Sequence, residues 1–383
     1  MDNLTNEELL SLLSSVFPRF ENDKKLGILV DIPREEKNDN EDWKKRRSIC
    51  INWYNELKRN ITSLNLEQVN LIAYPDVKSN NADLPYKCFI VTDKLPDTAN
   101  DLHDNGTETE FSKIFTDHQL FLAPTEFSTT APLKNSAKKF GFRAATMPGF
   151  SDKMIPALKI DYNEVYTRVK ILKDLLDPAI KADVVFAVDE ASEYLMDFDL
   201  RFRESHMSSG RFPFHSTAGN LPSGETYIVP YEGELEENSK TNGTLPVQIG
   251  NDILFYSIVQ NRAIEVLGSG EALEYEINYL ENEPAYGNIA ELGFGVLGDF
   301  GLDPINEILL DEKLGFHVAF GRSDHFGGII SPKNFSSQDK VIHLDRVYIK
   351  KMQPRISVLS IVLHYEDRES QTILLNGNYT IFD

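Results

Sequence analysis

The sequence predicts an α/β N-terminal domain with a largely parallel sheet, residues 1–182, followed by an α+β domain, residues 183–383. Three observations lead to this prediction. The length of 383 residues exceeds one ordinary core and suits two domains. Strand-like and helix-like segments alternate in the first half. In the second half, strand-like segments follow one another closely, with few helical segments between them.

The first half repeats a strand–helix rhythm. Apolar, β-rich runs that predict strands cover residues 26–32, 69–74, 88–91, 118–123 and 142–147. Apolar residues at helical spacing cover residues 41–60, 131–140 and 161–176, and Gly141 follows the second of these segments as a stop signal. Because crossover helices join parallel strands and cover both faces of their sheet, an α/β layer is expected here.

The second half is dominated by strand-like runs, at residues 183–188, 193–202, 226–230, 245–249, 253–259, 341–349, 356–364 and 372–382. Helical spacing recurs at residues 271–280 and 304–311. The turn Gly250-Asn251-Asp252 joins two of the runs as in a hairpin. Since short turns connect antiparallel strands, much of this half is expected to be antiparallel sheet.

The composition argues against several classes of protein. The formal net charge of −21 is opposed to nucleic-acid binding, which requires basic side chains to displace counterions from phosphates. The sequence holds no apolar run of membrane-spanning length, and its first residues lack a signal-peptide pattern. The two cysteines, Cys50 and Cys88, form neither a metal-binding spacing nor a disulfide framework. A cytoplasmic protein with no membrane and no nucleic-acid partner is expected.

The strongest local pattern is Ile342-His343-Leu344-Asp345-Arg346, which lies in a strand-like run. Side chains alternate along a strand, so His343 and Asp345 share one face and can converge on one cation. An imidazole and a carboxylate suit zinc, cobalt, manganese or iron. For this pattern alone, the alternative is a structural ion pair.

Three more candidates lie upstream. His317 is in the apolar run 315–321, Glu291 is in the apolar run 288–295, and Glu225 ends the turn-rich segment 220–225. A carboxylate within an apolar strand needs a cation or an ion-pair partner. Taken singly, these residues have other interpretations: a hydrogen-bonded core histidine, a salt bridge and a solvated turn residue, respectively.

The loop that follows His317, residues 322–328, is polar and contains glycines, as the rim of an active site often does. It offers two titratable groups, Asp324 and His325. Histidine exchanges protons near neutral pH, so His325 is the better proton carrier of the two.

Jointly, Leu-Pro-Ser-Gly-Glu225, Ala-Glu291-Leu-Gly, His317-Val-Ala-Phe-Gly and His343-x-Asp345 resemble, in this order, the catalytic domain of the aminopeptidase T/aminopeptidase S family of metallopeptidases. Residues 123–128, 145–149 and 199–202 also resemble that family, so the likeness spans about residues 118–350. It implies a metal-dependent aminopeptidase that releases N-terminal residues from peptides by means of metal-activated water.

The resemblance also implies a cofactor and an assembly. It assigns one or two divalent ions, zinc or cobalt foremost, and a homodimer. The residues that it makes metal ligands are Glu225, Glu291, His317, His343 and Asp345.

One position departs from the family, which has a tyrosine seven residues after its first histidine ligand. This chain has Asp324 at that place, with His325 next to it. We therefore expect His325 or Asp324 to handle the proton of the leaving amine. Glu225 or Glu291 takes that role instead if a single ion binds.

The same fold family includes 2,5-dihydroxypyridine dioxygenase, in which two histidines and an aspartate hold a single Fe(II). His317, His343 and Asp345 match that set. A mononuclear Fe(II) ring-cleaving dioxygenase with a small-molecule substrate is therefore the main alternative. Another hydrolase and a non-catalytic binding protein also stay open. The presence of both glutamates favours two metals, because one iron does not need all of these ligands.

Gly293-x-Gly295-x-x-Gly298 has the spacing of a dinucleotide-binding motif. It does not open a first βαβ unit, and no helix-like run follows it directly. Nucleotide binding is not expected from it.

Overall fold

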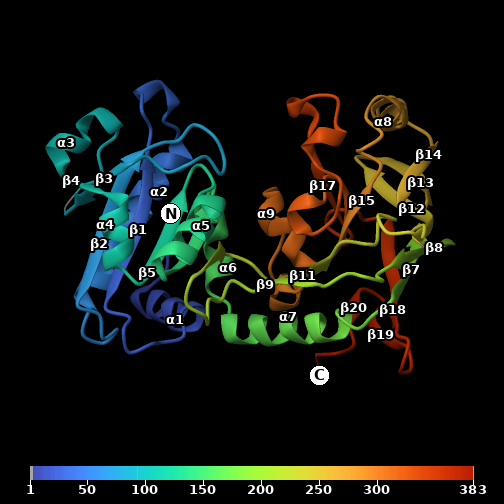
Figure 1. Ribbon diagram of the computed structural model, residues 1–383, viewed down its shortest axis with the longest axis horizontal. Helices are drawn as coiled ribbons and strands as arrows, with labels where there is room; N and C mark the ends of the chain where they lie inside the picture. The colour runs from blue at the N-terminus through green and yellow to red at the C-terminus, as the bar shows by residue number, and fades with distance from the viewer. Residues whose placement is uncertain (1–2, 93, 383) are drawn as a thin grey trace. The chain divides into compact units, whose positions relative to one another are not determined.

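The computed structural model describes residues 3–92 and 94–382. Contacts divide the chain into two compact units (Figure 1). Unit 1 comprises Met1–Tyr166 and Gly210–Ser223, and unit 2 comprises Thr167–Ser209 and Gly224–Asp383. The division falls within helix α7 (Tyr162–Leu176), whereas the sequence pattern changes near residue 182. The predicted domain boundary stays a prediction.

Unit 1 is built on a seven-stranded sheet in the order β10-β6-β5-β1-β2-β3-β4. Strands β10 to β2 pair in parallel, and β3 and β4 add an antiparallel edge. Its strands are β1 (Lys25–Ile32), β2 (Gln68–Pro75), β3 (Lys87–Val91), β4 (Gly106–Glu110), β5 (Leu120–Thr125), β6 (Arg143–Pro148) and β10 (Thr217–Asn220). The central strand β1 is buried along nearly its whole length, as expected for a parallel sheet covered on both faces.

Local signals set the helices of unit 1. The Asn40 side chain accepts the Trp43 N–H and starts α2, and Gly141, at φ 87°, ends α5. The α-helices are α1 (Asn6–Val16), α2 (Glu41–Arg59), α3 (Leu102–Asn105), α4 (Phe111–Asp117), α5 (Thr130–Phe140) and α6 (Ile155–Leu158). Short 3-10 turns are η1 (Glu36–Asn38), η2 (Ala99–Asp101) and η3 (Asp152–Met154).

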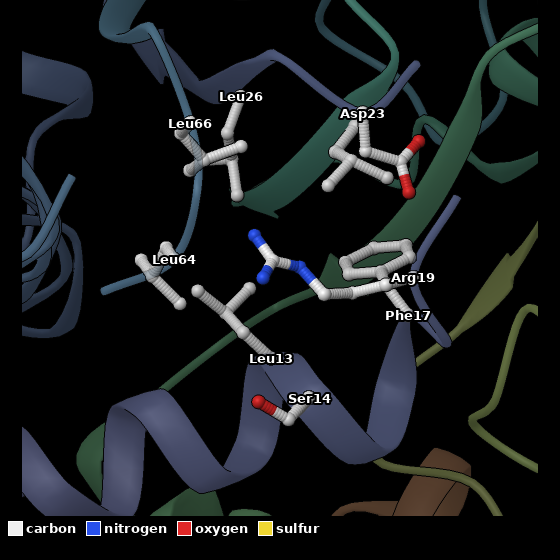
Figure 2. Close-up of a pocket in the computed structure, with 9 residues that line it drawn as sticks. Leu13, Ser14, Phe17, Arg19, Asp23, Leu26, Leu64 and Leu66 are labelled. Atoms are coloured by element: carbon white, nitrogen blue, oxygen red, sulfur yellow. The ribbon is translucent and has the colours of Figure 1, made fainter. Parts of the chain in front are cut away.

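A small cavity of about 30 Å³ lies in unit 1 (Figure 2). Its lining includes Leu13, Leu64 and Leu66, with the guanidinium of Arg19 among the leucines. This volume is enough for a water molecule or two and too small for a peptide or an aromatic substrate.

Unit 2 contains two sheets. The larger has eight strands in the order β14-β13-β12-β8-β7-β18-β19-β20, and the smaller has five in the order β17-β16-β15-β11-β9. All of their pairings are antiparallel. A mixed α/β structure with a partly parallel sheet and antiparallel sheets, as predicted, is therefore confirmed.

The strands of the larger sheet are β7 (Lys181–Val188), β8 (Ser192–Asp199), β12 (Asn242–Ile249), β13 (Asp252–Val259), β14 (Arg262–Gly268), β18 (Ile356–His364), β19 (Gln371–Leu375) and β20 (Asn378–Tyr379). Those of the five-stranded sheet are β9 (His206–Ser208), β11 (Glu225–Ile228), β15 (Ile289–Gly295), β16 (Phe316–Gly321) and β17 (His343–Val347).

One face of the five-stranded sheet packs against the larger sheet. The Phe316 ring lies 6.3 Å from that of Phe186, and the Phe320 ring lies 5.0 Å from that of Tyr256. Phe316 and Phe320 are on β16, whereas Phe186 and Tyr256 belong to the larger sheet. Because side chains alternate, His317 and Ala319 of β16 point to the opposite face. That opposite face carries the candidate site.

The helices of unit 2 are α8 (Glu271–Asn282) and α9 (Ile308–Asp311). The predicted helix over residues 304–311 was wrong for its first half. Asn306 adopts a left-handed φ of 64°, which interrupts a helix, and the Asp311 carboxylate accepts the Ile305 N–H. The 3-10 turns are η4 (Leu297–Phe300), η5 (Glu312–Leu314), η6 (Asp324–Phe326), η7 (Pro332–Asn334) and η8 (Gln338–Lys340).

Candidate metal centre

The register of the five-stranded sheet brings the predicted ligands to one face. Ala319 of β16 pairs with Glu291 of β15 on one side and with Asp345 of β17 on the other. His317 and His343 lie two residues from those paired positions along their strands, so they share the same face. Glu225 opens β11 and pairs with Gly295, which lies on that face of β15.

Glycines leave room for the larger groups on this face. A Cβ at Gly293 would overlap the His317 imidazole, and a Cβ at Gly295 would overlap the backbone of Lys313. A Cβ at Gly298 would overlap the Leu314 carbonyl oxygen. The glycine pattern that formally matches a dinucleotide motif thus accommodates the candidate centre and the turn that precedes β16.

Five side chains form two groups with donor atoms within 4.8 Å of one another. The first group is Glu225, Glu291 and His317, and the second is Glu291, His343 and Asp345. Glu291 belongs to both. Its Oε1 lies 3.3 Å from His317 Nε2, and its Oε2 lies 3.2 Å from His343 Nε2. Each oxygen of this carboxylate therefore serves a different group.

Backbone carbonyl groups orient both imidazoles through Nδ1. Nδ1 of His317 is 3.2 Å from the Gly315 carbonyl oxygen, and Nδ1 of His343 is 2.8 Å from that of Arg322. A carbonyl only accepts hydrogen bonds, so Nδ1 donates and Nε2 faces the carboxylates. A metal-binding histidine is typically fixed in this way by a backbone carbonyl or a carboxylate.

Two residues of the site were missed by sequence reasoning. Lys313 is 2% exposed, and its Nζ lies 3.0 Å from Glu225 Oε1. It also forms an ion pair with Glu312. A signal was present, since the charged run Asp311-Glu312-Lys313 stands directly before an apolar strand. Its separation of almost ninety residues from Glu225 hid the contact.

The electrostatics indicate an excess of negative charge. Burial opposes protonation of His317, but Glu291, Asp345 and Glu225 outweigh it and raise the His317 pKa to about 10. His343 behaves alike: burial lowers its pKa, and Asp345 and Glu291 raise it well above the ordinary value. Burial raises the Glu312 pKa to about 8. The carboxylates around both imidazoles therefore favour a positive charge at this place.

The donor set fits divalent cations. Glu225 Oε2 is buried and has no hydrogen-bond partner in the part of the chain that the structure describes. It points to the group it shares with Glu291 and His317, 3.8 Å from His317 Nε2. Carboxylate oxygens with imidazole nitrogens suit zinc, cobalt, manganese or iron. The assignment of the five residues as ligands stays a prediction.

The two predicted proton carriers lie on η6 and differ in their surroundings. Asp324 accepts a 2.5 Å bond from Arg322 Nε, and Arg322 keeps the Asp324 pKa low although burial opposes this. The ring of His325 lies 5.3 Å from that of His343. Burial and the neighbouring His343 lower the His325 pKa to about 4. His325 is thus a neutral imidazole beside the centre at neutral pH.

Tyr227 is a further residue that sequence reasoning missed. It lies two positions after Glu225 on β11, so its side chain is on the same face, in register with Gly293. Its ring is 4.8 Å from that of Phe326, which in turn is 5.4 Å from that of His343. Burial, with Glu291 and Glu225 nearby, raises the Tyr227 pKa, so the phenol keeps its proton.

A buried carboxylate, Glu232, anchors the loop that carries His325. It accepts hydrogen bonds from Asn288 Nδ2 at 2.6 Å, Ser323 Oγ at 2.6 Å and the Ile329 N–H at 2.5 Å. Ser323 and Ile329 lie at the two ends of this loop. Glu232 therefore fixes the loop at both ends.

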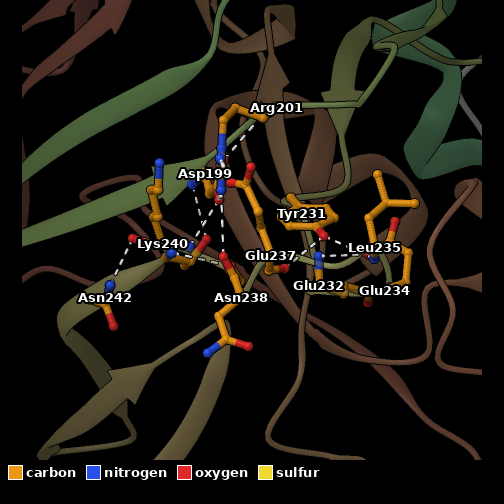
Figure 3. Close-up of polar contacts among 12 residues, drawn as sticks. Asp199, Arg201, Tyr231, Glu232, Glu234, Leu235, Glu237, Asn238, Lys240 and Asn242 are labelled. Atoms are coloured by element: carbon orange, nitrogen blue, oxygen red, sulfur yellow. Dashed lines mark hydrogen bonds and ion pairs between the residues drawn. The ribbon is translucent and has the colours of Figure 1, made fainter.

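The segment around Glu232 is itself braced (Figure 3). Arg201 donates from Nε and Nη2 to the two Asp199 oxygens, at 2.9 and 2.8 Å. Tyr231 OH donates to the Glu237 carbonyl and accepts the Leu235 N–H. The run Asp199-Leu200-Arg201-Phe202, singled out in the sequence, therefore supports the loop that holds Glu232.

Comparisons with known proteins identify a shared fold. No family profile matches the chain, and no curated protein matches its sequence. Two solved structures resemble it over 98% of its length. One is 2,5-dihydroxypyridine dioxygenase from Pseudomonas putida KT2440, with a TM-score of 0.57, 15% identity and 98% of that chain covered.

The other is wild-type AmpT from Thermus thermophilus, with a TM-score of 0.53, 12% identity and 99% of that chain covered. At these identities the likeness shows the fold alone. Both neighbours are enzymes, one an aminopeptidase and one a dioxygenase.

Within the described residues, no helix is both long and apolar enough to cross a bilayer.

Proposed function

We propose that the chain is a metal-dependent aminopeptidase that releases N-terminal residues from peptides. The observation that carries this proposal is the position of Glu291, whose two oxygens face different imidazoles at 3.3 and 3.2 Å. A carboxylate shared by two cations about 3.5–4 Å apart is the arrangement of two-metal hydrolases. AmpT, an aminopeptidase of the same fold, supports the same reading.

The five ligands have defined roles in this proposal. Divalent ions bound there would supply an acidified water molecule and positive charge beside the developing oxyanion. Glu291 would contribute to both positions. Glu225 with His317 completes one of them, and His343 with Asp345 completes the other. The hydrogen bonds at both Nδ1 atoms hold the imidazoles ready without reorganisation.

Proton transfer falls to His325 rather than to Asp324. Burial and the neighbouring His343 keep the His325 imidazole neutral, so its free ring nitrogen would take a proton transiently from the attacking water and return it to the leaving amine. Asp324 is already paired with Arg322. Tyr227 has a protonated phenol on the same face, and we assign it the hydrogen bond to the substrate carbonyl that the family tyrosine would otherwise make.

Charge favours a substrate with a free amino end. The net charge of −21 attracts cationic groups, and the candidate centre itself concentrates carboxylates. A peptide's α-ammonium is such a group, whereas an N-acetylated peptide has none. The homodimer and the cytoplasmic location belong to this proposal as well.

The test is hydrolysis of leucine p-nitroanilide and of a dipeptide by the metal-free protein reloaded with Zn²⁺, Co²⁺ or Mn²⁺. We expect turnover with metal, none after chelation, and none on the N-acetylated substrate. His343→Ala should remove bound metal and activity together. Unchanged metal content and turnover in that variant would refute the assignment.

A mononuclear Fe(II) dioxygenase is the second candidate, favoured by the higher TM-score of 0.57 to the dioxygenase. Its ligand set would be His317, His343 and Asp345. In the described chain, however, His343 and Asp345 group with Glu291, and His317 groups with Glu225 and Glu291. Oxygen uptake with 2,5-dihydroxypyridine and Fe(II), combined with no peptidase turnover under nitrogen, would favour this candidate over the first.

A further inference from the structure

Lys313 is the one lysine that contacts the candidate ligands among the residues that the structure describes. It lies on η5, directly before the strand that carries His317, and it is 2% exposed. Because Gly295 has no Cβ, the backbone of Lys313 can approach β15 at the level of Glu225. The fold therefore places an ammonium group at one end of the centre.

This ammonium engages one of the two positions. Its Nζ lies 3.0 Å from Glu225 Oε1, while Glu225 Oε2 is buried without a hydrogen-bond partner within the described chain. Lys313 thus occupies one oxygen of Glu225 and leaves the other for a cation. A dication shared by Glu225, Glu291 and His317 would have this positive charge as a close neighbour.

The other position has no such neighbour. Throughout residues 3–92 and 94–382, no lysine or arginine nitrogen lies within 4.0 Å of a carboxylate oxygen of Glu291 or Asp345. Their nearby cationic partners are the imidazoles of His317 and His343. The two positions have similar donors, each with two carboxylates and one imidazole, but Lys313 forms an ion pair with a carboxylate of the first position alone.

We propose that Lys313 makes the two metal positions unequal. The position formed by Glu291, His343 and Asp345 fills first and tightly, and the position formed by Glu225, Glu291 and His317 fills second and weakly because Lys313 repels its ion. Lys313 is a positioning residue, since it acts through Glu225. This inference rests on the proposed metal centre.

The experiment is calorimetric titration of the metal-free full chain with Mn²⁺, with electron paramagnetic resonance on the same samples to distinguish single from paired ions. Lys313→Met removes the charge at similar length, and Lys313→Arg retains it. Lys351→Met is the matched control, because Lys351 is an exposed lysine of the same unit that pairs with Asp303. Glu225→Gln and Asp345→Asn identify the two positions.

We expect two classes of binding in the unaltered protein. Lys313→Met should tighten the weaker class at least about tenfold, since a nearby like charge at low effective dielectric has a large cost. The tighter class should change by a smaller factor, because its ion would lie farther from the Lys313 ammonium. Lys313→Arg and Lys351→Met should leave the ratio of dissociation constants unchanged. Glu225→Gln should abolish the weaker class, and Asp345→Asn the tighter.

Several results would overturn the inference. Equal affinities in the unaltered protein, or loss of the tighter class in Glu225→Gln, would do so even if Lys313→Met failed to fold. If Lys313→Met weakened the binding of the second ion, the lysine would support that position and would not repel its ion. If Lys313→Met bound two metals with an unchanged ratio of dissociation constants, this inference would be wrong, but the proposed function would still stand. Absence of metal binding altogether would end both.

Discussion

The two units treat buried charge in different ways. In unit 1, Arg143 is 0% exposed, pairs with Asp23 at 2.5 Å and donates to the carbonyls of Pro18 and Phe212. Asp31 is likewise buried and accepts the backbone N–H groups of Glu126 and Phe127. Each of these buried charges has at least one partner of the chain itself, although Asp23 Oδ1 and Arg143 Nε have no hydrogen-bond partner among the described residues.

Unit 2 instead gathers several carboxylates on one sheet face. Glu225, Glu291 and Asp345 meet two imidazoles, and Lys313 is shared between Glu225 and Glu312. The carboxylates raise the pKa of both imidazoles and so favour positive charge on this face. The difference teaches that buried charge alone does not mark a site. A candidate site is marked where several carboxylates and imidazoles converge on one face.

The largest contrast is expected on neutralising one buried acid in each unit. Glu291→Gln should weaken binding of both ions by at least about a hundredfold, because even residues that only support a ligand are worth 10–100-fold. Peptidase turnover should be lost with the metal. Asp31→Asn should leave the metal content unchanged. Metal analysis after dialysis measures both, and full metal content in Glu291→Gln would contradict the comparison.

In unit 1, a pH effect is expected from Asp31. Burial raises the Asp31 pKa to about 6, against an ordinary value of 3.8. The folded state then retains this proton where the unfolded state has lost it, so stability falls as pH rises from about 4 to about 6. The loss is about 3 kcal/mol relative to Asp31→Asn. Urea unfolding at several pH values measures it, and parallel curves for the two proteins would contradict it.

Metal should stabilise unit 2 and leave unit 1 unchanged. An ion at a hundred times its dissociation constant adds about 2.7 kcal/mol to the free energy of unfolding. Differential scanning calorimetry with and without Zn²⁺ tests this, and hydrogen exchange assigns the protected strands. We expect protection of β15, β16 and β17. Equal protection in β1 and β5 would contradict the assignment of the cation to unit 2.

The smallest effect is expected at Glu232, which has all its partners within the chain. The Glu232 carboxylate accepts three hydrogen bonds, and the amide of Glu232→Gln has only one oxygen to accept them. The substitution should lower the free energy of unfolding by about 1–3 kcal/mol. KM should rise because the loop with His325 is less firmly held. Glu237→Gln is the control, since the Glu237 carboxylate is 61% exposed. If both variants had equal effects, Glu232 would not be an anchor.

The five candidate ligands were predicted from the family resemblance, because local pattern alone left each of them with another interpretation. His343 and Asp345 lie on one face of a strand whatever its neighbours are, and the apolar runs around His317 and Glu291 predicted their strands. The sequence could not show that Glu291 is central, because that depends on the register of β15 with β16 and of β16 with β17. Long loops join these strands, so their register is set by the packing of the whole sheet and cannot be read from any one segment.

The missed residues depend on contacts between distant segments. Glu232 bonds to Ile329, 97 positions away, and Lys313 reaches Glu225 only because Gly295 admits its backbone. The error at residues 304–311 had a different origin. Helical spacing of apolar residues was present there, but Asn306 adopts a left-handed conformation that a helix cannot contain.

The most direct test of the central claim is anomalous diffraction at the zinc or cobalt edge from crystals of the metal-loaded protein. Two peaks about 3.5–4 Å apart are expected, one on either side of the Glu291 carboxylate. One should lie beside Glu225 and His317, and the other beside His343 and Asp345. No peak, or a single peak bound by both histidines and Asp345 without Glu291, would contradict it.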